Sequence, residues 1–473
     1  MKLYLFNYKN IKKFLLYCHT LGILPTINLV FQKLHKANIH LEPTITPLSF
    51  QIPIETDFQE SLKIIPKIVT VVIPTKNAGP DFKKLLKKIK CQKGLQEIEI
   101  IIVDSGSTDK TLEIAQNEKV KVVEIPPEDF NHGYSRNKGA EHAEGDYVLF
   151  TVQDALPLTD RWIWELVMAL EKNDVTAVSC AEYPRSDCDL FYQWMIWNHY
   201  RTLNLDQDRI LEWDGSCGTY LGLRSNSQIN NVAALIKRDI FLKYGFRKKY
   251  AEDLDLGIRL IMDGRRIAFL YSTRILHSHN RPAYYFLKRS YVDTKFLYNV
   301  FADFPLPKIK NPQRLFGDMK SLFLRTKKVA SYLATVNSGR NLKTGDLIDH
   351  IVDLYYEDSG TIEASDTVSA VNDLGNFIQK LDAPIKDDQA PFKYNENIIL
   401  PHFLDSIKAL HAFVSQSREE VNGCLAHELE TALFKMLALN CGAYIAYLYL
   451  NHIGNRTEEL FPADLDKELS AGI

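Results

Sequence analysis

Apolar runs and amphipathic stretches alternate along the chain between residues 68 and 152. Two apolar runs rich in β-branched residues, at 68–73 and 98–103, are typical of strands buried on both faces of a sheet, and two further strands are predicted at 120–125 and 147–152. The stretches between them have helical spacing and span 81–91, 110–117 and 135–143. Because alternating strands and helices connect through right-handed crossovers, the pattern predicts an α/β fold with a mostly parallel central sheet.

The rest of the chain divides where this pattern changes. Two short amphipathic helices are predicted within residues 1–37, followed by a proline-punctuated linker at 41–66. Further helices and strands are predicted at 160–172, 188–204, 232–244, 253–263 and 266–271. Only helical spacing follows, at 313–335, 345–356, 366–381, 398–415 and 418–451. We therefore expect an N-terminal helical extension with a linker (1–65), an α/β domain (66–305) and a C-terminal all-helical domain (306–473).

Composition and charge narrow the class of protein. Hydrophobic residues make up 46% and charged residues 25% of the 473 residues, which is ordinary globular usage and excludes a disordered chain. The net charge of −2 argues against a dedicated nucleic-acid binder. The charge is uneven, because 9 basic and 22 acidic residues give the segment 341–473 a net −13. Seven cysteines without a Cys-x-x-Cys pair favour a reducing, cytoplasmic compartment.

Neither a signal peptide nor a membrane-crossing helix is predicted. The start of the chain lacks an apolar core followed by a small-residue cleavage site. The apolar stretch 14–31 is interrupted by Pro25, and the stretch 431–451 contains Lys435 and Asn440.

Polar turns follow three of the predicted strands. Thr75–Asn77 follows the first, Asp104–Asp109 the second and Gln153–Asp154 the fourth. Ligands on parallel sheets bind beyond the carboxyl ends of the strands, which is where these turns fall. Asp104 or Ser105 could hydrogen-bond a nucleotide base, although a helix N-cap would account for one residue of that turn equally well.

Two charged segments are predicted to open helices. At the first, Arg136 and the helix N-terminus together suit a diphosphate, although a pair with a surface acid would explain Arg136 as well. The second is Glu252-Asp253-Leu-Asp255. Acids in a first turn complement the helix dipole, and one of these carboxylates could instead act as a general base.

Possible metal ligands follow two other strands. A carboxylate at a strand end, such as Asp154, can bind a divalent ion bridged to phosphate oxygens, or it can cap the next turn. His277 and His279 come after the strand predicted at 266–271. Because residues i and i+2 share a strand face, both imidazoles can point the same way, and imidazole suits Mn²⁺ in a mixed oxygen and nitrogen site.

The order and spacing of these groups resemble the family-2 nucleotide-sugar glycosyltransferases of the GT-A fold. The matching stretches are Val-Val-Ile-Pro-Thr-Lys-Asn77, Ile-Val-Asp-Ser-Gly-Ser-Thr-Asp109, Arg-Asn-Lys-Gly139, Gln-Asp-Ala155 and Ala-Glu-Asp253. Three stretches look more narrowly like the bacterial rhamnosyltransferase branch, namely Phe-Asn-His-Gly-Tyr-Ser-Arg-Asn137, Thr-Val-Gln-Asp-Ala-Leu-Pro157 and His-Ser-His-Asn280. The resemblance covers residues 68–300.

The resemblance implies a role for each candidate. The nucleotide-sugar donor would be held by Thr75, Asn77, Asp104, Ser105, Arg136, Asn137, Gln153 and Asp154. Asp154, with His277 or His279, would bind Mg²⁺ or Mn²⁺. Asp253, with Glu252 beside it, would be the base of an inverting displacement. The acceptor would meet Trp213 and Asn231.

This sequence departs from the family's pattern at two positions. Ser105 stands where many members have a second aspartate, so the contact to the base can differ. Gln153 replaces the first carboxylate of the family's Asp-x-Asp, a change that the rhamnosyl branch also carries. The Gln-x-x-Arg-Trp motif of processive synthases is absent, so we expect the addition of one or a few sugars.

The resemblance thus predicts an inverting glycosyltransferase of bacterial surface polysaccharide synthesis. Its donor would be a dTDP- or UDP-sugar, with dTDP-rhamnose favoured, and its acceptor a saccharide or a polyprenol-linked saccharide. A nucleotidyltransferase would need a Gly-rich loop where this chain has Pro74–Asn77. A catalytically inactive scaffold subunit is the second alternative, and retention of the acids and both histidines argues against it.

Other features leave alternatives open. Trp194, Trp197 and Trp213 lie in the insert 183–231 and could either stack on a sugar or belong to the core. The helix 313–335 could rest on the inner face of the membrane through its basic residues, or pack on the α/β domain. The N-terminal helices allow the same two alternatives. The acidic helices beyond 345 could form a dimer, a lid or a docking surface.

Overall fold

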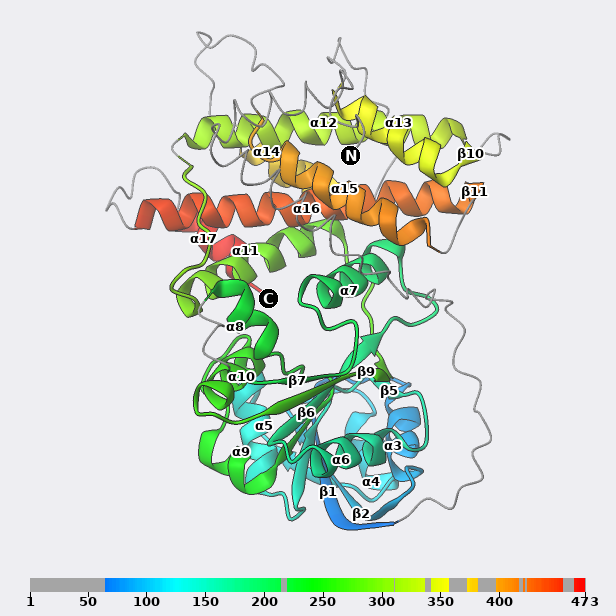
Figure 1. Ribbon diagram of the computed structural model, residues 1–473, viewed down its shortest axis with the longest axis vertical. Coiled ribbons are helices and arrows are strands. Elements are labelled where there is room, and N and C mark those ends of the chain that lie inside the picture. The colour runs from blue at the N-terminus through cyan, green and yellow to red at the C-terminus, as the bar shows by residue number, and fades with distance from the viewer. Residues whose placement is uncertain are drawn as a thin grey trace, which may run out of the picture.

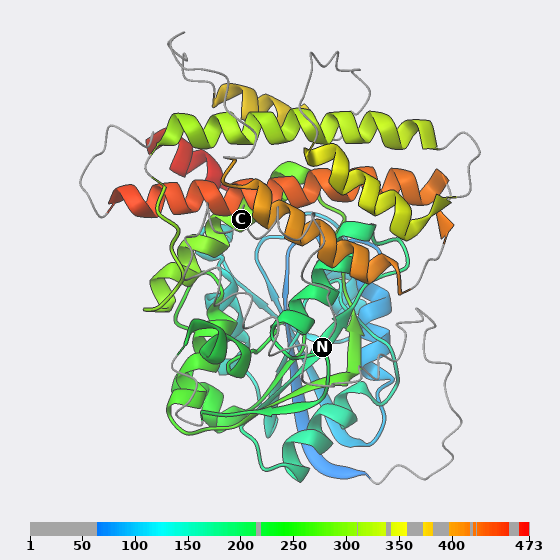
Figure 2. The ribbon, with the colours of Figure 1, turned by 45° about the horizontal axis from the view of Figure 1, so that its top comes forward.

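In the computed structural model, a layer of helices lies above a single large sheet, and α7 and α11 lie between the two (Figures 1 and 2). The structure describes residues 64–213, 219–309, 311–336, 342–356, 372–381, 397–416, 420–421, 423–453 and 463–472. The helices predicted within 1–37 and most of the predicted linker lie outside the described residues. In the described part of the chain, nine strands form the large sheet, in the order β3-β2-β1-β4-β8-β6-β9-β5 with β7 beside β9.

One half of the sheet is parallel, as the alternating pattern predicts. Its strands are β1 (Ile65–Thr75), β2 (Leu95–Asp104), β3 (Lys121–Glu124) and β4 (Tyr147–Phe150). β1 lies between β2 and β4 and is parallel to both, and β3 extends the sheet beside β2. The carboxyl ends of β1, β2 and β4 therefore meet at one edge.

The other half of the sheet is mixed. Its strands are β5 (Leu156–Pro157), β6 (Ala177–Tyr183), β7 (Arg209–Leu211), β8 (Ala234–Lys237) and β9 (Ile267–Leu276). β8 is antiparallel to both β4 and β6, whereas β6 is parallel to β9. The ends of β6 and β9 therefore lie side by side at the edge that already holds the ends of β1 and β4.

Helices cover both faces of the sheet because β1 is apolar on both sides. Val69, Val71 and Ile73 pack with α3 (Phe82–Lys90) and α6 (Trp162–Lys172) on one face. On the other face lie α5 (His132–Glu141), α9 (Arg238–Tyr244) and α10 (Glu252–Met262). The remaining helices of the α/β part are α4 (Thr111–Asn117), the short 3₁₀ helix η1 (Pro127–Asp129), α7 (Leu190–Thr202) and α8 (Tyr220–Asn226).

The C-terminal part is helical, as predicted, and shares one core with α7. Its elements are α11 (Ala283–Val300), α12 (Pro312–Val336), α13 (Thr344–Tyr356), α14 (Asn372–Lys380), α15 (Leu400–Val414), α16 (Gly423–Ile453), α17 (Ala463–Ser470) and the two-residue strands β10 (Leu342–Lys343) and β11 (Glu420–Val421). α11 was not predicted from the sequence, and it packs along α16. The division of the chain at 65 and 305 stays a prediction.

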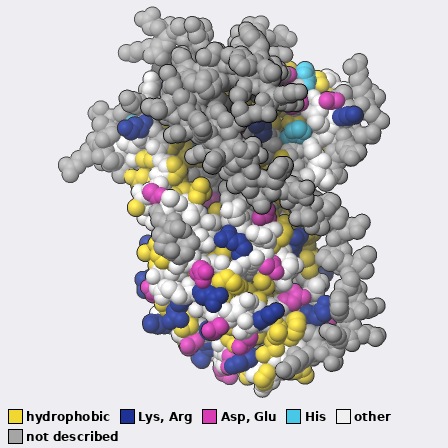
Figure 3. Space-filling model, in the orientation of Figure 1, with side chains coloured by type: hydrophobic (Ala, Val, Ile, Leu, Met, Phe, Trp, Pro, Cys, Tyr) yellow, Lys and Arg dark blue, Asp and Glu magenta, His cyan; other side chains and the backbone are white. Residues whose placement is uncertain are grey.

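α16 is long and apolar enough to cross a membrane by length and composition alone. However, 72% of its apolar window is buried inside the protein, as is usual for the central helix of a helical bundle. Basic and acidic side chains are interspersed over the α/β part of the face in Figure 3, which agrees with the near-neutral charge of the chain.

Candidate active site

The turn after β2 is built around a fully buried carboxylate. Asp104 Oδ1 accepts hydrogen bonds from Thr75 Oγ1 at 3.0 Å and from Ser107 Oγ at 2.6 Å. Its Oδ2 accepts from the backbone N–H groups of Gly106 and Ser107. Ser105 is also buried, and its hydroxyl donates to the Thr75 carbonyl at 3.1 Å. These hydrogen bonds hold the ends of β1 and β2 together. The predicted contact of these residues with a nucleoside stays a prediction.

Two amides hold the turn after β1 to its neighbours. Asn77, with a positive φ of 49°, accepts hydrogen bonds at Oδ1 from the N–H groups of Thr108 and Asp109. Gln153 accepts from the Lys76 N–H at 2.9 Å and donates to the Lys76 carbonyl at 3.3 Å. The three strand-end turns are therefore joined at one edge of the sheet, as their positions in the sequence predicted.

Asp154, His277 and His279 form a cluster at the same edge. One potential ligand atom from each residue lies within 4.8 Å of the others. His277 Nε2 is 3.7 Å from Asp154 Oδ1, and His279 Nδ1 is 3.6 Å from Asp154 Oδ2. Carboxylate oxygen together with imidazole nitrogen is a donor set that suits Mn²⁺ and also admits Mg²⁺. We call these three residues the DHH cluster.

Glu182, at the end of β6, fixes one imidazole of the DHH cluster. Its Oε2 lies 2.6 Å from His277 Nδ1, and its Oε1 accepts from Asn230 Nδ2 at 2.6 Å. Burial lowers the pKa of His277, but the charge and hydrogen bond of Glu182 outweigh burial and raise it. A carboxylate behind a ligating histidine sets its tautomer and leaves Nε2 directed at the ion. Sequence reasoning missed Glu182, because β6 itself was not predicted.

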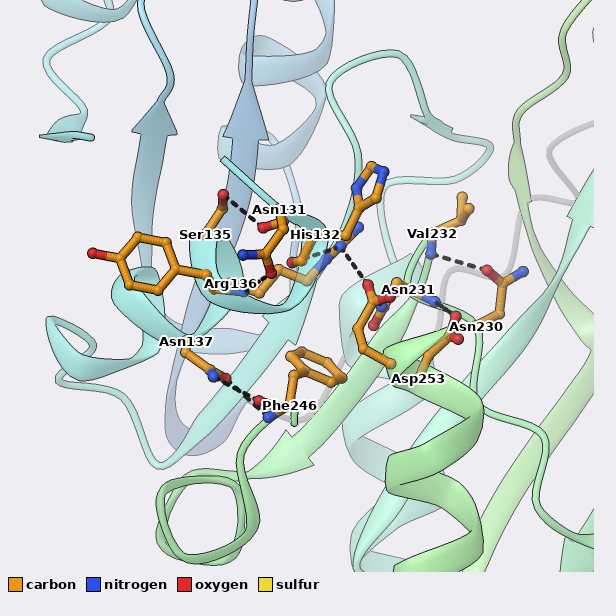
Figure 4. A network of polar contacts seen from close by, with 12 residues as sticks. Asn131, His132, Ser135, Arg136, Asn137, Asn230, Asn231, Val232, Phe246 and Asp253 are labelled. Atoms are coloured by element: carbon orange, nitrogen blue, oxygen red, sulfur yellow. Dashed lines mark hydrogen bonds and ion pairs between the residues drawn. The ribbon is translucent and has the colours of Figure 1, made fainter. Parts of the chain in front are cut away.

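A second set of acidic side chains lies at the start of α10, where Glu252 is buried in a polar network. Its Oε1 accepts from Arg136 Nη1 at 2.9 Å and from Asn231 Nδ2 at 2.8 Å. Burial and the neighbouring Asp253 raise the pKa of Glu252 to about 7, against the opposing charge of Arg136. The network is a buried ion pair held by an amide, and Figure 4 shows Arg136 reaching from α5 towards Asn231 and Asp253.

The prediction that Arg136 opens a helix is wrong, because α5 begins at His132 and Arg136 lies in its second turn. Its guanidinium is buried and pairs with Glu252 rather than with a surface acid. Asn137, the next residue, exchanges two hydrogen bonds of 2.9 Å with the backbone of Phe246 (Figure 4). Direct contact of either side chain with a donor stays a prediction.

Glu252 and Asp253 are adjacent acids, which we call the acidic pair, and Asp253 is the less buried of the two. Its Oδ2 accepts from the Asn231 N–H at 3.3 Å, and its Oδ1 from the N–H of Leu254 at 2.8 Å. Ala251, before the pair, has a positive φ of 46°, a strained conformation for a residue with a Cβ. Such strain is typical of functional turns. Asp253 thus keeps a carboxylate that is positioned by backbone donors and partly open to solvent.

Two consecutive asparagines connect the two groups. Asn230 donates to Glu182, which supports the DHH cluster, and Asn231 donates to Glu252. The DHH cluster and the acidic pair are therefore braced by one short segment, although they come from widely separated parts of the sequence. Asn231 was predicted as an acceptor ligand, and it is almost fully buried, with 6% of its surface exposed.

A polar hollow of about 360 Å³ opens beside the DHH cluster. It is lined by Asp81, Arg185, Asp187, Ser278, His279, Asn280 and Arg281. Arg185 donates to the Asp154 carbonyl at 3.5 Å and pairs with Asp81 at 3.2 Å. The two guanidinium groups of the hollow, from Arg185 and Arg281, were not predicted as site residues from the sequence, although Arg281 directly follows His-Ser-His-Asn280.

The tryptophans of the insert have different surroundings. Trp194 is buried in the core shared with the C-terminal helices. Trp197 lies against Phe413 of α15, with the two rings tilted by 47°, and lines a small hollow of about 20 Å³, which has room for about one water molecule. Trp213 is 38% exposed and precedes residues 214–218, which lie outside the described residues. Of these three, Trp213 is the most exposed.

Comparison with known proteins gives one family. The model of glycosyl transferase family 2 matches residues 70–228. The O-antigen chain rhamnosyltransferases WbaN of Salmonella anatum and RfbN of Salmonella typhimurium are each 30% identical over 45% of this chain. The alignments cover 66% and 67% of those proteins, so the chain spans about two thirds of their length.

Solved structures give more distant similarities. Residues 1–349 of TarS from Staphylococcus aureus match with a TM-score of 0.36 and 18% identity, over 48% of this chain and 64% of that one. The mannosyltransferase PcManGT from Pyrobaculum calidifontis, in complex with GDP-Man and Mn²⁺, matches with a TM-score of 0.38 and 16% identity, over 84% of this chain and 92% of that one.

Proposed function

This chain belongs to glycosyl transferase family 2 and has the GT-A type of fold, and we propose that it transfers a sugar from a nucleotide-diphosphate donor with inversion at the anomeric carbon. The favoured donor is dTDP-rhamnose, because the relatives WbaN and RfbN are rhamnosyltransferases. The acceptor is a saccharide or polyprenol-linked saccharide of a bacterial surface polysaccharide.

The observation that carries the proposal is the bracing of two chemically different groups by Asn230 and Asn231. Sugar transfer needs positive charge at the departing diphosphate and a base at the incoming hydroxyl. The DHH cluster supplies ligands for a cation, and the acidic pair supplies the base. A shared support keeps the two groups at a fixed separation, which supports their action on one bound donor.

The residues of the DHH cluster fit a divalent ion, because one carboxylate and two imidazoles converge and Glu182 fixes the tautomer of His277. Mg²⁺ or Mn²⁺ held there would stabilise the charge of the departing nucleotide diphosphate. Arg185 and Arg281 border the adjoining hollow, and we assign them to the diphosphate oxygens. The guanidinium of Arg136 is buried in its pair with Glu252, whereas the carboxylates that pair with Arg185 are exposed.

Asp253 is our candidate for the base. Its carboxylate is half-buried and positioned by backbone N–H donors, whereas that of Glu252 is enclosed and paired with Arg136. The acceptor hydroxyl oxygen attacks the anomeric carbon on the face opposite the diphosphate, and Asp253 takes the proton of that hydroxyl. The nucleotide diphosphate leaves with the electrons of the broken bond. Glu252 and Arg136 keep the first turn of α10 in place.

The test is Asp253→Asn, assayed for transfer from dTDP-rhamnose and UDP-sugars and for donor binding. We expect transfer to fall by ~10²–10⁴-fold with donor affinity unchanged, because general-base catalysis contributes that much. Asp255→Asn is the matched control, since Asp255 lies in the same helical turn but pairs with Arg259 at 2.9 Å. Wild-type turnover in Asp253→Asn, or an equal loss in Asp255→Asn, would remove Asp253 from this role.

A further inference from the structure

Two chain segments are joined by a ladder of hydrogen bonds that passes through the DHH cluster. The His277 N–H donates to the Tyr183 carbonyl at 3.0 Å, and Ser278 Oγ accepts from the Arg185 N–H at 3.1 Å. One step further, Asn280 Oδ1 accepts from the Asp189 N–H at 2.9 Å. The segment that carries both imidazoles is therefore fixed by the segment between β6 and α7.

Asn280 closes this ladder from both sides, because its Nδ2 also donates to the Asp187 carbonyl at 2.7 Å. Asp189 is the residue at which the ladder meets α7. Its Oδ1 caps that helix by accepting from the Tyr192 N–H at 3.0 Å, while its backbone N–H holds Asn280. A shift of Asp189 would therefore displace Asn280, the residue next to His279.

The other carboxylate oxygen of Asp189 is held by the C-terminal helical part. Lys435 of α16 places Nζ 2.6 Å from Asp189 Oδ2, and only 8% of the lysine side chain and 19% of the aspartate side chain are exposed. Phe286 of α11 lies beneath the ammonium group, with its ring centre 5.6 Å away. Lys435 is one of three charged residues in α16, the others being Glu428 and Glu430. Breaking its largely buried ion pair would leave an uncompensated charge in the core.

We propose that Lys435 is a positioning residue through which the C-terminal helices fix the DHH cluster. The path runs from Lys435 to Asp189 and from Asp189 through Asn280 to His279. This inference rests on the proposed function, because it takes the DHH cluster to be the metal site. It gives α16 a role in the chemistry of the α/β part in addition to packing.

A second ion pair of the C-terminal part provides a matched control. Lys295 of α11 pairs with Asp466 of α17, with 20% and 31% of the two side chains exposed. This pair also holds helices of the C-terminal part together, but among the residues that the structure describes, neither member has a hydrogen bond or ion pair to the ladder. Lys295→Met should therefore weaken the helical part without moving His279.

The experiment measures Mn²⁺ binding to the full chain, without nucleotide, by titration with detection of free Mn²⁺ by electron paramagnetic resonance. We expect Lys435→Met to weaken Mn²⁺ binding on the order of tenfold, the lower end of the effect of outer-shell partners. Lys295→Met should bind Mn²⁺ like the wild type. Asp189→Asn keeps the helix cap but removes the charge, so it should also weaken binding.

The outcomes separate this inference from the proposed function. Equal Mn²⁺ affinity in the wild type and Lys435→Met overturns the role of Lys435 and leaves the metal site standing. Equal weakening in Lys295→Met also overturns it, because general loosening would then explain the effect. If Lys435→Met does not fold, Asp189→Asn decides by the same criterion. An absence of saturable Mn²⁺ binding by the wild type would overturn the metal site itself.

Discussion

Glu252 gives the protein a specific dependence of stability on pH. Burial and the negative charge of Asp253 raise the pKa of its carboxyl group from 4.5 to about 7 in the folded chain. Between these two pH values the folded state keeps a proton that the unfolded state has lost. The stabilising contribution of Glu252 is therefore fully present below pH 4.5 and is lost as the pH rises through about 7.

The magnitude follows from the width of that window. Each pH unit between the two pKa values is worth about 1.36 kcal/mol, so the window corresponds to about 3 kcal/mol. In Glu252→Gln this contribution is absent, because the amide does not titrate. The free energy of unfolding of the wild type minus that of Glu252→Gln should fall by about 3 kcal/mol between pH 4.5 and pH 7.

The assay is denaturant unfolding of both proteins at several pH values from 4 to 8, followed through the transition of the α/β part. Taking the difference between the two proteins cancels the titrating groups that do not interact with Glu252. A difference that does not change with pH would refute the reasoning. A difference that grows with pH would mean that the charge of Arg136, 2.9 Å from Glu252, outweighs burial.

Three further substitutions test separate parts of the account. Asp154→Ala should weaken Mn²⁺-dependent donor binding, and unchanged affinity by calorimetry would count against the DHH cluster. Gly139→Ala should lower the midpoint of thermal unfolding, because its Cβ would lie 2.3 Å from Val72 Cγ1, an overpacking that costs about 1–3 kcal/mol; an unchanged midpoint would show that α5 can move away from β1. Ala251→Gly should leave the midpoint equal or higher, since glycine adopts a φ of 46° without strain, and a lower midpoint would contradict the strained turn.

The parallel half of the sheet could be predicted because its two long strands, β1 and β2, are rich in β-branched residues, and because β1, β2 and β4 are followed by polar turns. The position of Asp154 and the two histidines could also be predicted, since strand ends meet at one edge. β6 was missed because its sequence, Ala-Val-Ser-Cys-Ala-Glu-Tyr, mixes small and polar residues with few β-branched ones. α11 was missed because its many aromatic residues have weak helix propensity, and packing against α16 supplies what propensity lacks.

Pairs of residues that are distant in the sequence could not be predicted from local sequence patterns. The pair of Arg136 and Glu252 joins residues 116 positions apart, and nothing local in either segment identifies the other. The roles of Glu182 and Lys435 depend in the same way on how β6 and α16 pack. Local pattern predicts where polar groups end up on a sheet, whereas only the assembled core decides which of them pair.

The central claim is that the DHH cluster holds a divalent ion at the bound donor. The most direct measurement is anomalous X-ray diffraction at the manganese edge, from crystals of the full chain grown with Mn²⁺ and a nucleotide diphosphate. The account predicts an anomalous peak coordinated by Asp154 and at least one of His277 and His279, with the diphosphate in the adjoining hollow. A bound nucleotide without manganese at these residues, or manganese at a different site, would contradict it.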